Sequence, residues 1–198
     1  MPSLARSHDP DQSVVLWLLR VGDREEQRRL IVAGASAYVL AQGLTGLSLR
    51  PLAASLGTSD RMLLYYFESK DELVEEVLRV LSAGLQGLLA ESFPARRVAV
   101  RTLVEAADEL LARPEMRPST ALCLELLGLA ARGTEPYASA ARTLLWEWID
   151  WAESRLSGPV RGRRARAVGA VACIEGILVL RGSGVDDRLP AALRSVLR

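Results

Sequence analysis

One stretch constrains the fold more than any other. Residues 48–70, SLRPLAASLGTSDRMLLYYFESK, read as two short helices joined by a tight turn. Ser48 can cap the first helix and Gly57 can end it, because glycine enters the left-handed conformation without a Cβ clash. Thr58 or Ser59 can then cap the second helix through a side-chain oxygen. Two short helices around a glycine turn form a helix-turn-helix, whose second helix lies in the major groove when the motif binds DNA.

The pattern of these residues resembles the TetR family of bacterial transcriptional regulators. The resemblance is carried by Ser48-Leu49-Arg50, Leu52-Ala53, Leu56-Gly57, Leu63, Tyr66-Phe67, Ser69-Lys70 and Glu72-Leu73, and it extends back over Ile31–Gly43. It implies an all-α fold with an N-terminal three-helix DNA-binding domain and a C-terminal helical domain for effector binding and dimerisation. The chain departs from the commonest family pattern at Asp60, Leu64 and Tyr66, which leaves the operator sequence open.

Composition agrees with a helical chain and sets limits on function. Nearly half of the 198 residues are apolar, and the formal net charge is only +1, so a DNA-binding surface must come from placement of charge. No apolar run reaches about 18 residues, and residues 14–19 are too few for a signal peptide, so we expect a cytoplasmic protein. Cys123 and Cys173 lack zinc spacing, which predicts buried free thiols.

The helical periodicity, together with the domain roles that the resemblance implies, divides the chain into three parts. Residues 1–22 form a leader with a possible short helix at 13–20, residues 23–68 the helix-turn-helix domain, and residues 69–198 the effector-binding and dimerisation domain. Beyond the motif we expect helices over 69–90, 94–112, 118–132, 135–156 and 161–181, with a last short helix at 187–197. Ser69 and Glu72 form a capping box, and Thr134 is placed to cap the helix over 135–156.

The predicted DNA-binding residues lie in and around the motif. They are Ser48, Arg50, Ser59, Arg61, Tyr65, Tyr66 and Lys70. Arg61 is the one cation of the second helix and our first choice for a base contact. The two tyrosines can donate hydrogen bonds to phosphates, and the resemblance implies a phosphate contact for Lys70. Arg20, Arg24, Arg28 and Arg29 either belong to a surface that packs on its own domain or lie near DNA phosphates.

The resemblance also implies an effector pocket between helices of the second domain. Candidate lining residues are Leu85, Leu89, Leu103, Leu110, Met116, Cys123, Glu125, Leu127, Tyr137 and Trp148. The alternative for each is a plain core position. Glu125 and Glu175 stand in apolar surroundings, where an unpaired carboxylate is costly. Each therefore lies on an exposed strip, pairs with an arginine, or faces a ligand; in the last case the ligand is a cation or a hydrogen-bond donor.

The helices at 135–156 and 161–181 are the predicted dimer interface. Trp146, Trp148 and Trp151 cluster on the first, and large aromatic residues are enriched at interfaces. Gly169, Ala172 and Gly176 on the second would allow close helix approach. Arg161, Arg163, Arg164 and Arg166 either pair with Glu147, Asp150 and Glu153 or form a second anion-binding surface.

These observations favour a homodimeric, ligand-responsive DNA-binding regulator, a repressor that a small effector releases from a palindromic operator. The alternative is an all-helical ligand-binding or protein-interaction module that no longer binds DNA. No catalytic constellation is found: His8 is the only histidine, and the sequence has no phosphate loop and no nucleophile elbow. We therefore expect no enzyme activity, no cofactor and no metal.

Overall fold

The computed structural model describes residues 23–45, 47–91 and 97–185. Within these residues it contains eight α-helices, one 3-10 helix and no strand, which confirms the predicted all-α class. The chain forms two compact units, Met1–Val77 and Leu78–Arg198. The short helices predicted at 13–20 and 187–197, and the arginine at position 20, lie outside the described residues. Among the helices described, none is both long and apolar enough to span a membrane.

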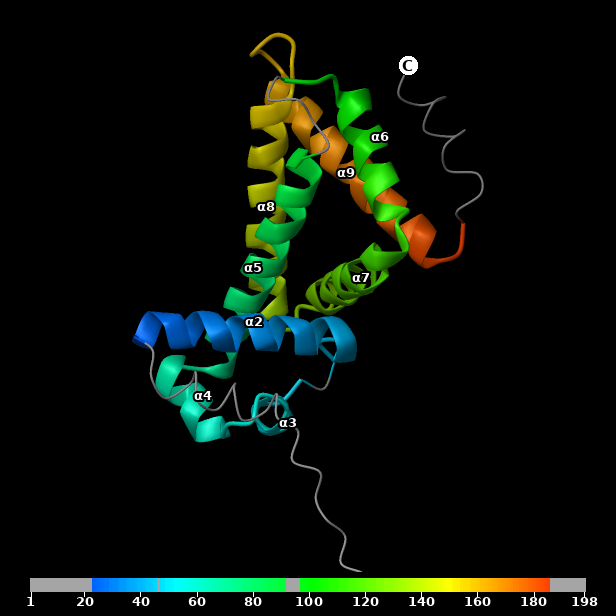
Figure 1. The fold of residues 1–198 in the computed structure, drawn as a ribbon. Coiled ribbons are helices and arrows are strands. Elements are labelled where there is room, and N and C mark those ends of the chain that lie inside the picture. Colours follow the sequence, from blue (N-terminus) through cyan, green and yellow to red (C-terminus); the bar gives the residue numbers. More distant parts are fainter. Residues whose placement is uncertain (1–22, 46, 92–96, 186–198) are drawn as a thin grey trace, which may run out of the picture. The chain divides into compact units, whose positions relative to one another are not determined.

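The first unit is built from three helices and the start of a fourth. They are α2 (Arg24–Gln42), α3 (Leu49–Ser55), α4 (Asp60–Tyr66) and the first residues of α5 (Lys70–Glu91). Figure 1 shows the long α2 running across the two short helices, with which it packs. The fully buried side chains include Val39, Leu52, Leu63 and Phe67, so one side of every helix points into a shared apolar core.

The local signals of the motif are confirmed with two differences. Ser48 is the N-cap residue of α3, but its side chain makes no capping hydrogen bond. The Ser59 side chain caps α4 by accepting from the Met62 amide at 3.2 Å. Gly57 takes a φ of +64°, in the left-handed region that an L side chain rarely adopts. Ser69 accepts from the Glu72 amide as predicted, but the Glu72 carboxylate accepts from the amide of residue 68. In a standard capping box this carboxylate would accept from the amide of the N-cap residue, which is Ser69. Here it accepts from the amide one residue earlier.

The second unit contains the rest of α5 and five further helical segments. They are α6 (Val100–Leu111), a 3-10 turn (Pro114–Met116), α7 (Arg117–Ala131), α8 (Tyr137–Arg155) and α9 (Arg163–Gly182). Helix α9 packs against α6, α7 and α8 (Figure 1) and carries Ala167, Ala170 and Ile177 into the core. This burial on several sides explains the almost uniformly apolar sequence of α9.

Three boundaries in the second unit differ from the prediction. The helix predicted over 94–112 is α6, which starts at Val100, and the described residues 97–99 before it are not helical. The expected loop at 113–118 contains the 3-10 turn and already the start of α7. Thr134 is not the N-cap of α8; that position belongs to Pro136, and the Glu135 carboxylate accepts from the Ser139 amide at 3.1 Å. Thr134 contributes its backbone carbonyl instead, which accepts from Ala138 at 2.9 Å.

Charged side chains join helices within this unit. Arg181 of α9 pairs with Asp108 of α6 at 2.5 Å, and both side chains are largely buried. Arg164 pairs with Asp150 and Glu153, which confirms the predicted pairing for this arginine. Arg163 and Arg166 instead donate to backbone carbonyls of the turn before α9, at Gly158 and Pro159 respectively.

Candidate nucleic-acid interface and helical cavity

Helix α4 has one buried face and one exposed face. Leu63 and Phe67 lie in the core, and Tyr66 is 9% exposed. Leu64 is 47% and Tyr65 61% exposed, and Arg61 is also exposed. Residues three and four apart share one face of a helix, so the side chains at 61, 64 and 65 form a continuous outward strip. This strip is the part of the helix-turn-helix that a duplex could contact.

The predicted DNA-binding residues are mostly accessible in the structure. Ser48, Arg50, Ser59, Arg61 and Tyr65 are exposed, and Lys70 is half-buried. Tyr66 belongs to the core and offers the least surface of the seven. Its ring lies edge-on to that of Tyr65, with the centroids 5.0 Å apart.

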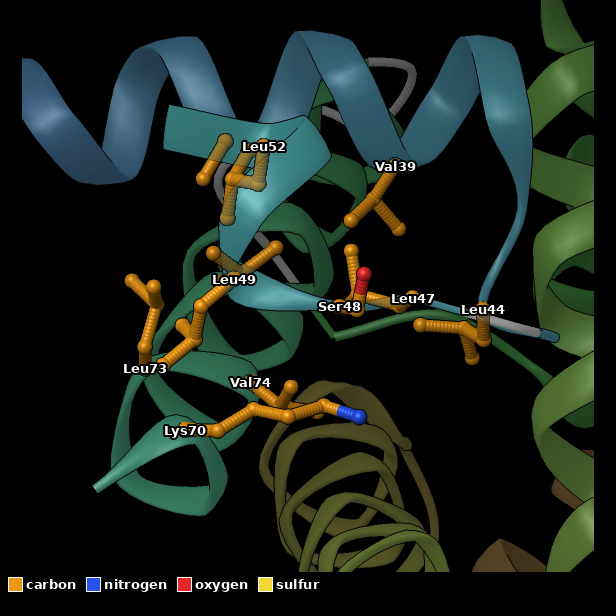
Figure 2. Close-up of a pocket in the computed structure, with 11 residues that line it drawn as sticks. Val39, Leu44, Leu47, Ser48, Leu49, Leu52, Lys70, Leu73 and Val74 are labelled. Atoms are coloured by element: carbon orange, nitrogen blue, oxygen red, sulfur yellow. The ribbon is translucent and has the colours of Figure 1, made fainter. Parts of the chain in front are cut away.

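Ser48 and Lys70 come together although they belong to different elements. Figure 2 shows Lys70 from the start of α5 and Ser48 from the cap of α3 among apolar side chains such as Leu47 and Leu73. The cavity they line has a volume of about 10 Å³, no more than about one water molecule requires. It is therefore a packing gap and not a ligand pocket.

Arg28 of α2 holds α4 and α5 together. Its guanidinium donates to the Tyr66 carbonyl at 2.7 Å and to the carboxylates of Glu72 and Glu76 at 2.9 and 3.2 Å. It also lies 4.4 Å from the centroid of the Phe67 ring. The side chain thus meets the end of α4, the linker after it and the first turns of α5, a role that the sequence analysis missed.

The neighbouring arginines of α2 differ in their surroundings. Arg29 is exposed and pairs with Glu26 within the same helix at 2.7 Å. Arg24 lies over the Tyr65 ring, with its guanidinium carbon 5.5 Å from the centroid, and donates to the Tyr65 carbonyl. Arg28 therefore packs on its own domain, whereas Arg24 lies beside an exposed tyrosine of the second helix. Proximity of these arginines to DNA phosphates stays a prediction.

The bonds around Glu72 alter its acidity. Partial desolvation acts to raise the pKa of this carboxyl, but the hydrogen bonds from the residue 68 amide and from Arg28 outweigh it and lower the pKa below the ordinary value of 4.5. Glu72 is therefore ionised at neutral pH. The ionised form is the one that accepts from both Arg28 and the backbone.

A larger cavity lies inside the second unit. It has a volume of about 60 Å³ and is surrounded by α5, α6, α7, α8 and α9. Five predicted ligand-binding residues line it: Leu85, Leu89, Leu110, Cys123 and Trp148. The indole of Trp148 is held in place by a hydrogen bond to the Ser82 hydroxyl at 3.0 Å.

The other five predicted lining residues do not border this cavity. Leu103, Met116 and Tyr137 are buried core residues, and Glu125 and Leu127 are half-buried on α7. The sequence analysis missed Ala107, Leu111, Val171, Ile174 and Leu178 as lining residues, and it left open which glutamate faces the cavity. Of the two, Glu175 of α9 lines it. The signal that could have identified Glu175 is that it is the one glutamate of the largely apolar helix α9.

Glu175 and Cys123 share this wall and affect each other. Burial raises the pKa of Glu175, and one of its oxygens, Oε2, is enclosed without a hydrogen-bond partner in the described structure. Burial and then the charge of Glu175 raise the pKa of Cys123 to about 12, so this thiol stays protonated at neutral pH. Cys123 and Cys173 are both free and half-buried. Among the described residues, no group of His, Cys, Asp and Glu side chains could hold a metal ion.

The fold and the outward strip of α4 define a helical protein with a helix-turn-helix unit and a separate helical unit around a cavity. Residues 31–77 match the sequence model of the tetR family of bacterial regulatory proteins. The recognised resemblance to the TetR family is thus confirmed: the chain carries the N-terminal domain of this family and has the fold of its transcriptional regulators. This fold supports a DNA-binding regulator.

Two solved structures are similar to the described chain. SCO7518 of Streptomyces coelicolor A3(2), described as a transcriptional regulator, is 22% identical with a TM-score of 0.62, over 78% of this chain and 87% of its own. A protein of Rhodococcus sp., described as a TetR-family transcriptional regulator, is 18% identical with a TM-score of 0.67, over 86% and 98%. At these identities the likeness concerns the fold. A search of curated proteins found no match.

Proposed function

We propose that this chain is a ligand-responsive bacterial DNA-binding transcriptional regulator, a repressor that a small effector releases from its operator. The observation that supports it most is the exposed strip of α4, which carries Arg61 and Tyr65. In a DNA-bound helix-turn-helix, the second helix lies in the major groove, where its side chains reach base edges. Arg61 is the proposed base contact, because arginine donates two hydrogen bonds to guanine O6 and N7.

The residues around this helix suit contacts that position the protein. Arg50, Lys70 and Tyr65 would donate to phosphates, as would the hydroxyls of Ser48 and Ser59. Such contacts fix register and orientation without reading the sequence. Because Met62 and Leu64 are exposed on the same helix, an apolar contact with thymine methyl groups is the second proposed element of sequence readout.

A homodimer through α8 and α9 would supply two such units. Trp146 on α8 and Val168, Val179 and Leu180 on α9 are exposed apolar side chains. No neighbouring atom lies within 4 Å of a Cβ placed on Gly176, so a second helix could approach closely there. The two recognition helices would enter successive major grooves about 34–36 Å apart and read a palindromic operator.

Effector binding in the cavity of the second unit would control DNA binding. The effector must bind the DNA-competent and the released state with different affinities, or the equilibrium does not move. Helix α5 is continuous from Lys70 to Glu91 and contributes residues to both units, so it is the proposed element that transmits the change. A chromosomal operator would place the protein in the cytoplasm.

The decisive experiment selects bound duplexes from genomic fragments with the full-length protein and measures affinity by fluorescence anisotropy at several salt concentrations. A palindromic site supports both DNA reading and two-fold symmetry. Arg50→Ala combined with Lys70→Ala should reduce the slope of log affinity against log salt by about four for the dimer, because two phosphates per subunit are no longer neutralised. Arg101→Ala is the control, because this exposed arginine of α6 pairs with Glu105 in its own helix.

A second candidate function is an all-helical ligand-binding or protein-interaction module that no longer binds DNA. The exposed Met62 and Leu64 favour it, because an apolar surface also suits a protein partner. Asp60, at the start of α4, would repel a nearby phosphate. If no duplex is selected, this second function replaces the first. If a duplex is selected and the double variant binds it as the unchanged protein does, Arg50 and Lys70 are not the phosphate contacts.

A further inference from the structure

The cavity of the second unit is apolar except for one carboxylate. Its walls come from leucines, isoleucine, valine and alanine, with Trp148, Cys123 and Glu175 as the remaining members. Glu175 sits on α9, which packs against α6, α7 and α8. Its Oε2 atom is enclosed and accepts no hydrogen bond within the described structure. The cavity therefore contains an acceptor that the chain itself does not satisfy.

No described cation neutralises this carboxylate. The nearby helices α5, α6 and α8 contribute only apolar side chains and Trp148 to the cavity, and α7 contributes the protonated thiol of Cys123. The arginine one and a half turns further along α9, Arg181, pairs with Asp108. Of the three alternatives for Glu175, pairing with an arginine does not occur among the described ion pairs. A buried carboxylate without a partner is costly.

We propose that this cavity binds a small organic cation, a protonated primary amine whose ammonium group lies against Glu175 and whose apolar part lies against the leucines. This inference rests on the proposed function only for its regulatory meaning, since it names the class of the effector. An ammonium group would supply the missing partner of Oε2. A neutral apolar ligand would leave the carboxylate unpaired, and an anion would be repelled by it.

Trp148 adds a second recognition element for a cation. It lines the same cavity as Glu175, and its indole is fixed by the hydrogen bond to Ser82 and by an edge-on contact with Trp151 at 5.4 Å between centroids. Indole is the side-chain ring that attracts cations most strongly, and the attraction grows when the cation is removed from water. A fixed indole and a buried carboxylate in one apolar cavity are the components of an amine site.

The size of the cavity limits the ligand. A volume of about 60 Å³ accommodates a few water molecules or a short alkyl group. A larger amine would enter only if the lining helices move apart. Such a requirement would couple binding to a change in helix packing.

The test measures binding of matched ligand sets to the full-length protein by titration calorimetry, with tryptophan fluorescence as a second readout. The sets are n-butylammonium, n-butanol and butyrate, and benzylammonium, benzyl alcohol and benzoate. The ammonium member of at least one set should bind ten-fold or more tightly than its alcohol, and the carboxylates should not bind. If neither ammonium ion binds more tightly than its alcohol, the proposal is overturned.

Two variants locate the preference. Glu175→Gln keeps the shape and removes the charge, so it should lower ammonium affinity ten-fold or more and leave alcohol affinity unchanged. Glu125→Gln is the matched control, because Glu125 is half-buried on α7 and does not line the cavity. Retention of the ammonium preference in Glu175→Gln, or its loss in Glu125→Gln alone, would overturn the assignment.

A pH series gives an independent readout. The ammonium ion needs the ionised carboxylate, whereas burial favours the protonated one, so protons and the cation compete at Glu175. Ammonium affinity should therefore fall as the pH is lowered through the raised pKa of Glu175, and it should stay flat in Glu175→Gln. A flat profile in the unchanged protein contradicts the proposal.

Failure of this inference can be told apart from failure of the proposed function. DNA affinity is measured on the selected duplex without any ligand. Duplex binding without a cation preference would reject the amine site and leave the DNA-binding regulator intact. A Glu175-dependent cation preference in a protein that selects no duplex would support the amine site and reject the DNA-binding regulator.

Discussion

Replacing Arg28 with alanine should loosen α4 while leaving the exposed side chains of its outward strip in place. The guanidinium bonds the Tyr66 carbonyl at the end of α4 and the carboxylates of Glu72 and Glu76 on α5, and it covers the Phe67 ring. Arg28→Ala removes every one of these interactions. The perturbation therefore takes away the common partner of two helices without touching the exposed strip of α4.

The expected magnitude follows from the exposure of the groups. The Arg28 side chain is 21% exposed, so each carboxylate pair contributes about 0.5–1 kcal/mol. The bond to the carbonyl adds about 1 kcal/mol, and the contact with the aromatic ring about 0.5 kcal/mol. Together the free energy of opening α4 should fall by about 2.5–3.5 kcal/mol, and Arg28→Lys should lose about half of that because one ammonium cannot reproduce the fork.

Amide hydrogen exchange followed by mass spectrometry measures this quantity locally. Peptides covering residues 60–67 should exchange about 60- to 300-fold faster in Arg28→Ala, since each 1.4 kcal/mol is a factor of ten. Peptides from α8 should be unchanged. The difference in exchange rate between Arg28→Ala and the unchanged protein should shrink as the pH falls below about 4.5. Folding lowers the pKa of Glu72, so this carboxyl stabilises the fold only while it is ionised.

Arg29→Ala is the matched control for this measurement. Arg29 is the next residue of the same helix, is 68% exposed and pairs with Glu26 in its own helix. Such a pair contributes about 0.5 kcal/mol or less. If Arg28→Ala accelerates exchange no more than Arg29→Ala does, the guanidinium does not hold α4, and the reasoning from its contacts is refuted.

Three further predictions concern the second unit. Asp108→Ala should lower the free energy of unfolding by about 3 kcal/mol in urea titrations, because it leaves the charge of Arg181 in a largely buried position; a loss below about 1 kcal/mol would mean that solvent screens the pair. Glu175→Gln should stabilise the fold at pH 8 and lose this advantage as the pH falls, because a raised pKa means that the ionised carboxyl is the costly form; equal stability of both proteins at every pH would contradict this. Gly176→Ala should leave the monomer fold intact but weaken dimerisation in analytical ultracentrifugation, whereas Gly87→Ala, another helical glycine with open space around it, should not; an unchanged dimer would move the interface elsewhere.

The local structure of the motif was predictable because its causes are local. The cap at Ser59 and the left-handed turn at Gly57 depend on residues within one or two helical turns. The failed cap at Thr134 shows the limit of such reasoning. A threonine before a proline reads as a cap, but α8 begins only after Pro136, and the carboxylate next to that proline takes the role.

The predictions of ligand-binding residues were limited in the same way, because a local sequence pattern does not specify how helices pack. The sequence marks Leu103 and Cys123 equally as apolar residues on helical stripes. Only the packing of the helices decides that Cys123 borders the cavity and that Leu103 is sealed in the core. The choice between Glu125 and Glu175 could not be made from sequence either, because both stand in equally apolar surroundings.

The sequence by itself determined the all-α class, the cap at Ser59, the turn at Gly57 and the motif that carries the family resemblance, since neighbouring residues set the energies of these features. The tertiary structure decided which residues meet across helices. Arg28 and Glu72, or Asp108 and Arg181, are separated by dozens of residues, and no local pattern specifies such a pair. Their contacts follow from the burial of every apolar helix face at once, which only the folded chain establishes.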